Sequence, residues 1–379
     1  MTCQTITELE TPAMLLVQGR MQKNIARMRD QLSRLKVSFR PHVKTAKCIE
    51  VALAMSGGAP GPITVSTLRE ADHFADHGFT DILYAVGITP NKMAHVAALQ
   101  QRGVKLTVIL DSLDGAQVLV RAASAMPVPV NALIEIDCDG HRAGLLPESA
   151  ELLAVAEVLA TGGVRVAGVM THAGGSYDCR GDEALRTMAE QERARTVRAA
   201  QRLRLAGHAA PVVSVGSTPT ALFAQDLTGV TEVRAGVFVF FDLVMAGLGV
   251  CRVDDIAVSV LTTVIGHQRE KGWTIVDAGW MAMSRDRGTA TQPVDQGFGL
   301  VCDANGEVMP DFIMISANQE HGIIAHRDGN NGKTLDLPIG AKLRILPNHA
   351  CATAAQHARY QVLNDTAAVA DVWERISGW

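Results

Sequence analysis

Eight strand-like segments alternate with helix-like segments over residues 37–242, and this alternation constrains the fold more than any other feature of the sequence. Several of the eight are nearly continuous apolar runs, as expected for parallel strands that are buried on both faces. Amphipathic stretches, which are typical of surface helices, lie between most of them. The strand-like segments are residues 37–44, 62–67, 81–86, 105–111, 130–137, 165–174, 211–218 and 232–242.

Eight successive strand–helix units predict a (β/α)8 barrel of the TIM type. An amphipathic helix over residues 21–35 precedes the first strand, and a long charged helix that begins at Asp182 ends at Gly207. The alternative fold is a doubly wound open sheet. It is disfavoured because no GxGxxG motif follows the first strand.

The pattern changes near residue 255. From there, strand-like segments are separated by turns, and no long helical pattern intervenes. Asn305 and Gly306, between two such segments, are a signal for a β-hairpin. The sequence therefore predicts a barrel domain over residues 19–250 and an all-β domain formed by residues 1–18 and 251–379.

Composition disfavours several classes of function. The net charge of −4 gives no reason to expect nucleic acid or an anionic membrane as a partner. No apolar run reaches the roughly 20 residues that span a bilayer, and the N-terminus has no secretory signal pattern. Seven scattered cysteines without a paired framework are typical of the reducing cytoplasm, where we expect this protein.

Lys44 falls at the carboxyl end of the first predicted barrel strand, after the alternating stretch VSFRPHV. In (β/α)8 barrels the chemistry takes place at that end of the strands. A lysine in an enclosed barrel mouth can form a Schiff base. Lys47, by contrast, is predicted to be a solvated charge in the helix that follows.

The segment SVGSTPTAL predicts a phosphate site. Gly216, Ser217 and Thr218 end the seventh strand. Pro219 suits the first turn of a helix that Thr218 caps, and helix starts bind phosphate through their N–H groups. Gly236, at the end of the eighth strand, lets the backbone approach a ligand. A lysine and a phosphate cradle together are what pyridoxal phosphate needs.

His349 and Cys351 lie in the segment LPNHACAT, which is predicted to be extended. Alternate side chains of an extended segment share one face, about 6–7 Å apart. An imidazole and a thiolate form a zinc-type pair, and two protein ligands leave positions for substrate or water. The pair predicts a catalytic site for one divalent metal, either zinc or manganese or magnesium.

Further polar side chains end predicted barrel strands, and their shared position favours a common site. Thr67 among them is expected to contact the cofactor, as is Gly216. The full set is Ser66, Thr67, Tyr84, His141, Arg142, His172 and Tyr177.

With these residues assembled, the sequence resembles the fold-type III pyridoxal-phosphate enzymes over nearly its whole length. The branch is that of D-threo-3-hydroxyaspartate dehydratase, D-serine dehydratase and D-threonine aldolase. The resemblance implies an alanine-racemase-like barrel with a C-terminal β-domain, and a homodimer. The motifs that carry it are TPAMLL, NIARM, RPHVKTAK, ITVSTLREA, IEIDCDGHRAG, THAGGSY, VSVGSTPTA, TEVRAGVFVFFD, VDAGWMAMSRDRGTA, NQEHG and PNHACAT.

The resemblance also implies residue roles. Lys44 carries the cofactor covalently, and His349 and Cys351 bind the metal. Cys351 points to dehydration, because the aldolase branch has an aspartate there. The residues that match phosphate-binding positions are Ser217, Thr218 and Gly236. The residues that match positions around the pyridine ring are Arg142, His172 and Tyr177.

The implied activity is the release of ammonia and a 2-oxo acid from a D-3-hydroxy amino acid. The preferred substrate is D-threo-3-hydroxyaspartate, which gives oxaloacetate, and its second carboxylate favours Arg285 and Arg287 as binding groups. D-serine dehydratase and metal-activated D-threonine aldolase remain alternatives. A racemase would need a second base, and a cofactor carrier without catalysis would need no metal.

Overall fold

The computed structural model describes residues 4–124, 126, 128–329, 333–364 and 368–379. The chain divides into two compact units. The barrel unit comprises Arg27–Gly236 and Gly378–Trp379, and the β unit comprises Met1–Ala26 and Val237–Ser377. Among the described residues, no helix has both the length and the apolar character needed to cross a membrane.

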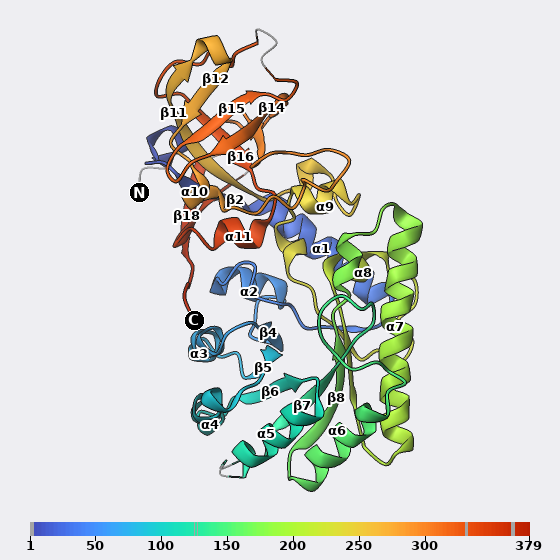
Figure 1. The fold of residues 1–379 in the computed structure, drawn as a ribbon. Coiled ribbons are helices and arrows are strands. Elements are labelled where there is room, and N and C mark those ends of the chain that lie inside the picture. Colours follow the sequence, from blue (N-terminus) through green and yellow to red (C-terminus); the bar gives the residue numbers. More distant parts are fainter. Residues whose placement is uncertain (1–3, 125, 127, 330–332, 365–367) are drawn as a thin grey trace. The chain divides into compact units, whose positions relative to one another are not determined.

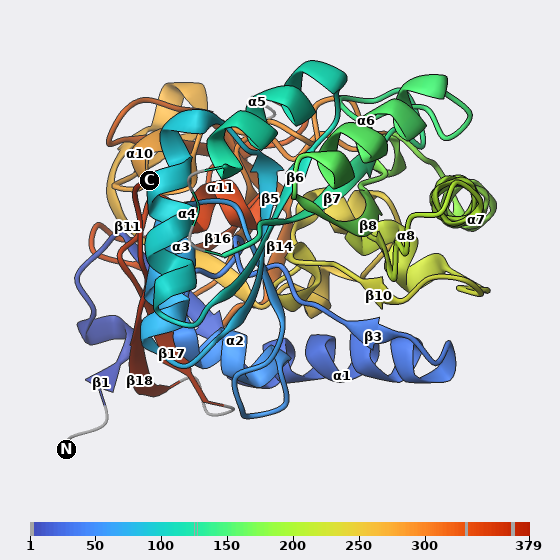
Figure 2. The same ribbon diagram turned by 90° about the horizontal axis from the view of Figure 1, so that it is seen from below.

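The barrel unit is built on eight parallel strands, and helices lie outside them (Figures 1 and 2). The strands are β3 (Ser38–Phe39), β4 (Ile63–Val65), β5 (Asp81–Gly87), β6 (Lys105–Leu110), β7 (Asn131–Ile136), β8 (Arg165–Thr171), β9 (Val212–Val215) and β10 (Glu232–Val233). The helices are α2 (Ile49–Met55), α3 (Leu68–Asp76), α4 (Met93–Gln101), α5 (Leu113–Ala123), α6 (Ala150–Thr161), α7 (Asp182–Leu205) and α8 (Thr218–Phe223).

The eight strands close into a barrel. Their order is β3-β10-β9-β8-β7-β6-β5-β4, and a parallel bridge between His42 and Thr64 joins the two ends of this series. The backbone of Arg40 and His42 continues the closure by donating hydrogen bonds of 2.9 Å to the carbonyls of Val233 and Ala235. The predicted (β/α)8 barrel is confirmed.

The first and the eighth barrel strands are much shorter than predicted. The first covers only Ser38–Phe39 of the expected residues 37–44, although the backbone of Arg40 and His42 still donates to Val233 and Ala235. The eighth covers only Glu232–Val233 of the expected residues 232–242, because the chain then turns into a 3₁₀ helix, Val237–Val239. Lys44 and Gly236 therefore lie in segments that follow the strands.

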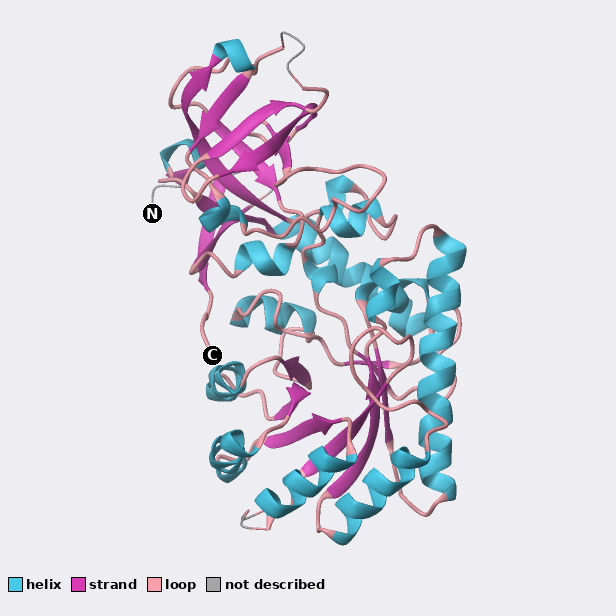
Figure 3. Ribbon diagram, in the orientation of Figure 1, coloured by secondary structure: helices cyan, strands magenta, loops and turns pink. Residues whose placement is uncertain are grey.

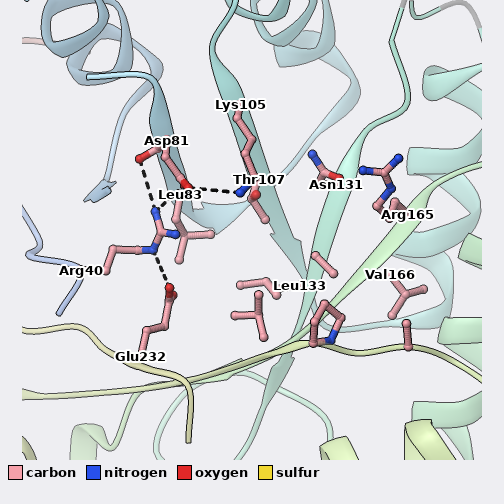
Figure 4. A pocket seen from close by; sticks show the side chains of 14 residues that line it. Arg40, Asp81, Leu83, Lys105, Thr107, Asn131, Leu133, Arg165, Val166 and Glu232 are labelled. Atoms are coloured by element: carbon pink, nitrogen blue, oxygen red, sulfur yellow. Dashed lines mark hydrogen bonds and ion pairs between the residues drawn. The ribbon is translucent and has the colours of Figure 1, made fainter. Parts of the chain in front are cut away.

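Apolar side chains from four adjacent strands fill the barrel interior; they are Leu83, Ile109, Leu133 and Met170. A cavity of about 250 Å³, bordered by two of these leucines, opens at the amino ends of the strands (Figure 4). Arg40 joins Asp81 at 2.8 Å and Glu232 at 2.9 Å there. These charges compensate one another, so a network of ion pairs links the strands at this end of the barrel.

The β unit consists mainly of antiparallel strands (Figure 3). Six of its strands form a closed barrel, because β16 pairs back with β11. Its strands are β1 (Gln4–Thr5), β2 (Ala13–Val17), β11 (Val258–Gln268), β12 (Trp273–Val276), β13 (Leu300–Cys302), β14 (Val308–Ala317), β15 (Gly322–His326), β16 (Lys342–Leu346), β17 (Arg359–Leu363) and β18 (Ala368–Glu374). The hairpin predicted at Asn305-Gly306 is confirmed, since it joins β13 to β14.

Three short α-helices lie between described strands of the β unit: α9 (Leu243–Gly247), α10 (Trp280–Met283) and α11 (Ala350–Ala354). The longer helix α1 (Gln18–Arg34) contributes residues to both units, because the division falls after Ala26. Buried side chains from distant parts of the chain hold this unit together, among them Leu15, Leu261 and Leu363.

Candidate functional site

Lys44 is an exposed amine just beyond the bridge that closes the barrel. Its backbone N–H donates to His42 Nδ1 at 3.4 Å. Among the described residues, no hydrogen bond or ion pair engages its Nζ atom, whereas Arg40 and Lys47 of the same unit have carboxylate partners. A primary amine without an ion-pair partner is available for covalent chemistry.

Two imidazoles near Lys44 are held in the neutral form. Burial, and then the Lys44 charge, lower the pKa of His172 to about 3. The same two causes lower the pKa of His42 well below its ordinary value. His172 donates from Nδ1 to the Gly216 carbonyl at 2.9 Å, so its Nε2 carries the lone pair. Neither imidazole therefore carries a charge beside the amine.

The loop after β9 starts with Gly216 and leads into α8. Ser217, and not Thr218 as predicted, is the N-cap of this helix, because its hydroxyl accepts from Thr220 N at 3.2 Å. Thr218 is the first helical residue and is buried. Gly216 adopts φ +146°, and a Cβ there would collide with the Arg234 carbonyl. Only glycine fits at this point of the loop.

A buried carboxylate joins two loops at the carboxyl rim of the barrel. Glu192, on α7, accepts hydrogen bonds of 3.0 Å from the backbone N–H groups of Ala173 and Gly216. These residues follow β8 and β9 respectively. Ser176 and Ser217 join the same two loops through their hydroxyls, 2.9 Å apart. Helix α7 thus fixes the relative position of the two loops.

The other predicted rim residues fall into two groups. Arg142 lies close enough to His172 to lower its pKa, and the ring centroid of Tyr177 is 6.5 Å from that of His172. Thr67 is instead the N-cap of α3, accepting from Glu70 N at 3.0 Å. Gly236 packs against the His42 carbonyl, which a Cβ would meet at 2.9 Å.

The prediction that Lys47 is a solvated charge is wrong. Its Nζ lies 3.0 Å from Oε1 of Glu70, a fully buried carboxylate, and its own side chain is only 15% exposed. It also precedes α2 instead of lying within it, since that helix begins at Ile49. A buried carboxylate needs a compensating charge, and Lys47 supplies it.

His349 and Cys351 lie at the start of a helix, so the extended geometry predicted for LPNHACAT is wrong. His349 is the N-cap of α11, and Cys351 stands two residues later in its first turn. Alanine has the highest helix propensity, and the run Ala350–Ala354 is rich in it. The cap geometry still keeps the imidazole and the thiol within hydrogen-bond reach of each other.

Carboxylates surround the imidazole of His349. Its Nδ1 lies 2.6 Å from Asp286 Oδ2. Asp242, which is buried, accepts from Ala350 N at 2.9 Å and so fixes the start of α11. Burial opposes protonation of His349, but the Cys351 thiolate and the Asp286 carboxylate outweigh it and raise the pKa of His349 to about 11. These groups therefore favour a positive charge at the imidazole, supplied either by a proton or by a metal.

The two arginines of MSRDRG differ in their surroundings. Arg287 pairs with Asp295 at 2.7 Å and lies over the ring of Phe298. Arg285 is exposed, lies 4.4 Å from the ring centroid of Trp280, and has no carboxylate partner among the described residues. Of the two, Arg285 has the guanidinium that is available to bind an anion.

The residues present fit both groups that the resemblance implies. At the barrel rim, an amine without an ion-pair partner lies near two neutral imidazoles and a hydroxyl-rich loop. The amine can react with an aldehyde and the loop can bind a phosphate, so the site suits pyridoxal phosphate. In the β unit, an imidazole and a thiol are the donors that zinc takes. No group of three such ligands occurs among the described residues, so a metal there would keep open positions.

Sequence reasoning missed several residues of these two centres. The alternation that pointed to Lys44 also places His42 on the same side, two residues earlier. Asp286 stands between the two arginines that were singled out. Glu192 had no local signal, because it looks like one charge among many on a long polar helix.

Comparisons with known proteins agree with this architecture. The model of the alanine racemase N-terminal domain matches residues 18–244, and that of a putative serine dehydratase domain matches residues 257–363. D-threo-3-hydroxyaspartate dehydratase of Delftia sp. (strain HT23) is 53% identical over 99% of both chains. D-serine dehydratase of Dictyostelium discoideum is 31% identical over 95% of both.

A solved structure extends the likeness to three dimensions. It is a variant of D-threo-3-hydroxyaspartate dehydratase, with one cysteine replaced by alanine, in the metal-free form. The match has a TM-score of 0.95 at 52% identity and covers 99% of this chain and 100% of the other. The chain therefore belongs to the fold-type III pyridoxal-phosphate enzyme family that includes D-threo-3-hydroxyaspartate dehydratase and D-serine dehydratase.

Proposed function

We propose that this chain is a pyridoxal-phosphate- and divalent-metal-dependent dehydratase that converts D-threo-3-hydroxyaspartate into oxaloacetate and ammonia. The observation that carries the proposal is the 53% identity, over 99% of both chains, with the Delftia enzyme of that name. The chemistry of the two centres supports it, since one offers an available amine and the other an imidazole–thiol pair.

Lys44 would hold pyridoxal phosphate through its Nζ atom, and the phosphate would lie at the loop Gly216–Thr218, near Gly236. When bound, pyridoxal phosphate stabilises the electron pair left on a substrate carbon after a proton has been removed. Lys44 Nζ would take the α-proton of the substrate, because the imidazoles beside it are poor bases in this environment.

Three further residues would contact the pyridine ring: Arg142, His172 and Tyr177. His172 is held by its bond to the Gly216 carbonyl and keeps a neutral Nε2 acceptor. Thr67, whose hydroxyl caps α3, would also contact the cofactor. The positions of His172 and Tyr177 depend on a loop that Glu192 joins to the one after β9.

His349 and Cys351 would bind the metal, which supplies a Lewis acid for the departure of hydroxide, a poor leaving group. Zinc suits the donor set, and manganese or magnesium could replace it in a site with few protein ligands. Arg285 would bind the second carboxylate of the substrate, with Arg287 held by Asp295 in support.

The proposal includes a homodimer in the cytoplasm. The dimer follows from the family resemblance, and light scattering should give about twice the 40.4 kDa of one chain. The six cysteines among the described residues form no disulfide, which suits a reducing compartment. D-serine dehydratase is the second candidate activity, favoured by the 31% identity with the Dictyostelium enzyme.

The cofactor part of the proposal is tested by colour. Purified protein reconstituted with pyridoxal phosphate should be yellow and should bleach when borohydride reduces the Schiff base. Lys44→Ala should remain colourless, while Lys105→Ala, at the opposite end of the barrel, should match the wild type. A wild-type protein that stays colourless with added cofactor would contradict the proposal.

A further inference from the structure

We propose that Asp286 is a positioning residue that orients His349 for metal binding. The inference rests on the metal site proposed above and concerns only the β unit. It gives the segment MSRDRG a second role, because the residue between the two arginines contacts the imidazole directly.

The contact selects one nitrogen of the ring. Asp286 Oδ2 lies 2.6 Å from His349 Nδ1. A carboxylate can only accept a hydrogen bond, so Nδ1 carries the proton. Nε2 is then the nitrogen at which a metal would replace a proton, and an imidazole hydrogen-bonded in this way is also a better ligand.

The carboxylate is itself held in place. Its other oxygen, Oδ1, accepts from Gly288 N at 2.8 Å, and its backbone N–H donates to Ser284 Oγ at 3.2 Å. Arg287 is engaged with Asp295, and Arg285 with the Trp280 ring, so neither neighbouring arginine pairs with Asp286 among the described contacts. Oδ2 of the carboxylate is therefore directed at the imidazole while Oδ1 is held by the backbone.

Asn348 links the loop that carries Asp286 to the helix start that carries His349. It is buried and directly precedes His349. Its Nδ2 donates to the Asp286 carbonyl at 3.2 Å and to the Gly297 carbonyl at 2.7 Å, and its Oδ1 accepts from Thr289 Oγ1 at 3.1 Å. The loop that carries the carboxylate and the helix start that carries the imidazole are thus fixed to each other.

The experiment measures metal affinity, a property that does not depend on turnover. The full-length protein, freed of metal by a chelator, is titrated with Zn²⁺ by calorimetry. Asp286→Asn keeps the shape but removes the charge, and Asp286→Ala removes both. We expect Zn²⁺ affinity to fall by about 10- to 100-fold, more for alanine than for asparagine. Asp336→Asn, an exposed carboxylate of the same unit paired with Arg269, should match the wild type.

Spectroscopy separates positioning from general damage. Co²⁺ bound by the wild type should show a thiolate charge-transfer band, and the visible bands of the Asp286 variants should shift because the imidazole is misaligned. Unfolding of the metal-free proteins shows whether each variant is folded. Wild-type Zn²⁺ affinity and Co²⁺ spectra in both Asp286 variants would overturn the inference. His349→Ala and Cys351→Ala test the site itself: if they too bind Zn²⁺ like the wild type, the proposed metal pair fails.

Discussion

Lys44 and Lys47 show how surroundings decide what a side chain can do. Both follow the first barrel strand, and the sequence distinguishes them only by position. The Nζ atom of Lys47 lies 3.0 Å from Oε1 of the buried Glu70, so Lys47 compensates that charge and has a structural role. Lys44 has no such partner among the described residues and stands beside two neutral imidazoles. Lys44 is therefore the lysine that is free to react.

Neutral His172 should make the protein less stable in acid. Its pKa is about 3 in the folded protein and about 6.5 when unfolded. Between these values the unfolded chain binds more protons, so the free energy of unfolding falls as the pH drops. Between pH 7 and pH 5 we expect the wild type to lose about 2 kcal/mol more than His172→Asn, measured by urea unfolding.

The exposed His321 provides the control for this comparison. His321→Asn should follow the wild type at both pH values, because the side chain lies at the surface. Equal losses of stability for the wild type and His172→Asn would show that the folded protein does not keep this imidazole neutral.

At the scale of elements, helix α7 links the rim loops of the barrel. Glu192 accepts from the backbone of two loops, and α7 has no other residue whose carboxylate does so among the described contacts. The loops carry His172 and Tyr177 on one side and Gly216–Thr218 on the other. A change in helix α7 should therefore alter the affinity for the cofactor.

Glu192→Ala leaves two buried N–H groups without acceptors, at a cost of about 1–3 kcal/mol each. We expect lower unfolding free energy and roughly tenfold weaker binding of pyridoxal phosphate, measured by absorbance titration. Glu192→Gln keeps one oxygen as an acceptor and should retain most of both properties. Cofactor affinity unchanged in Glu192→Ala would show that the loops do not depend on α7.

The sequence predicted some elements better than others, for physical reasons. The central strands β5 to β9 appear where continuous apolar runs indicated them, because strands buried on both faces leave that mark. The helix at Ala350–Ala354 was missed, since a short apolar segment looks alike as strand or helix. Glu192 and Asp286 were missed because contacts between distant segments leave no local pattern. The boundaries 19–250 and 251–379 stay a prediction about folding domains.

At the scale of the whole molecule, each unit carries one kind of chemistry. The barrel unit holds Lys44 and the loop Gly216–Thr218, and the β unit holds His349 and Cys351. Cofactor binding and metal binding should therefore be separable by experiment, although the proposed reaction needs both.

Metal removal should make that separation visible. We expect a chelator to stop the release of 2-oxo acid while the yellow colour of the bound cofactor persists, because the metal ligands lie in the β unit. Adding back Zn²⁺ or Mn²⁺ should restore activity. Undiminished release of 2-oxo acid from protein shown to be free of metal would contradict the role given to His349 and Cys351.

The most direct test is the product formed from D-threo-3-hydroxyaspartate by purified protein supplied with pyridoxal phosphate and a divalent metal. Ammonia and oxaloacetate should appear in equal amounts, with a higher kcat/KM than for D-serine or D-threonine. Formation of glycine and glyoxylate would show aldol cleavage instead. That outcome, or no reaction with this substrate, would contradict the proposed dehydratase.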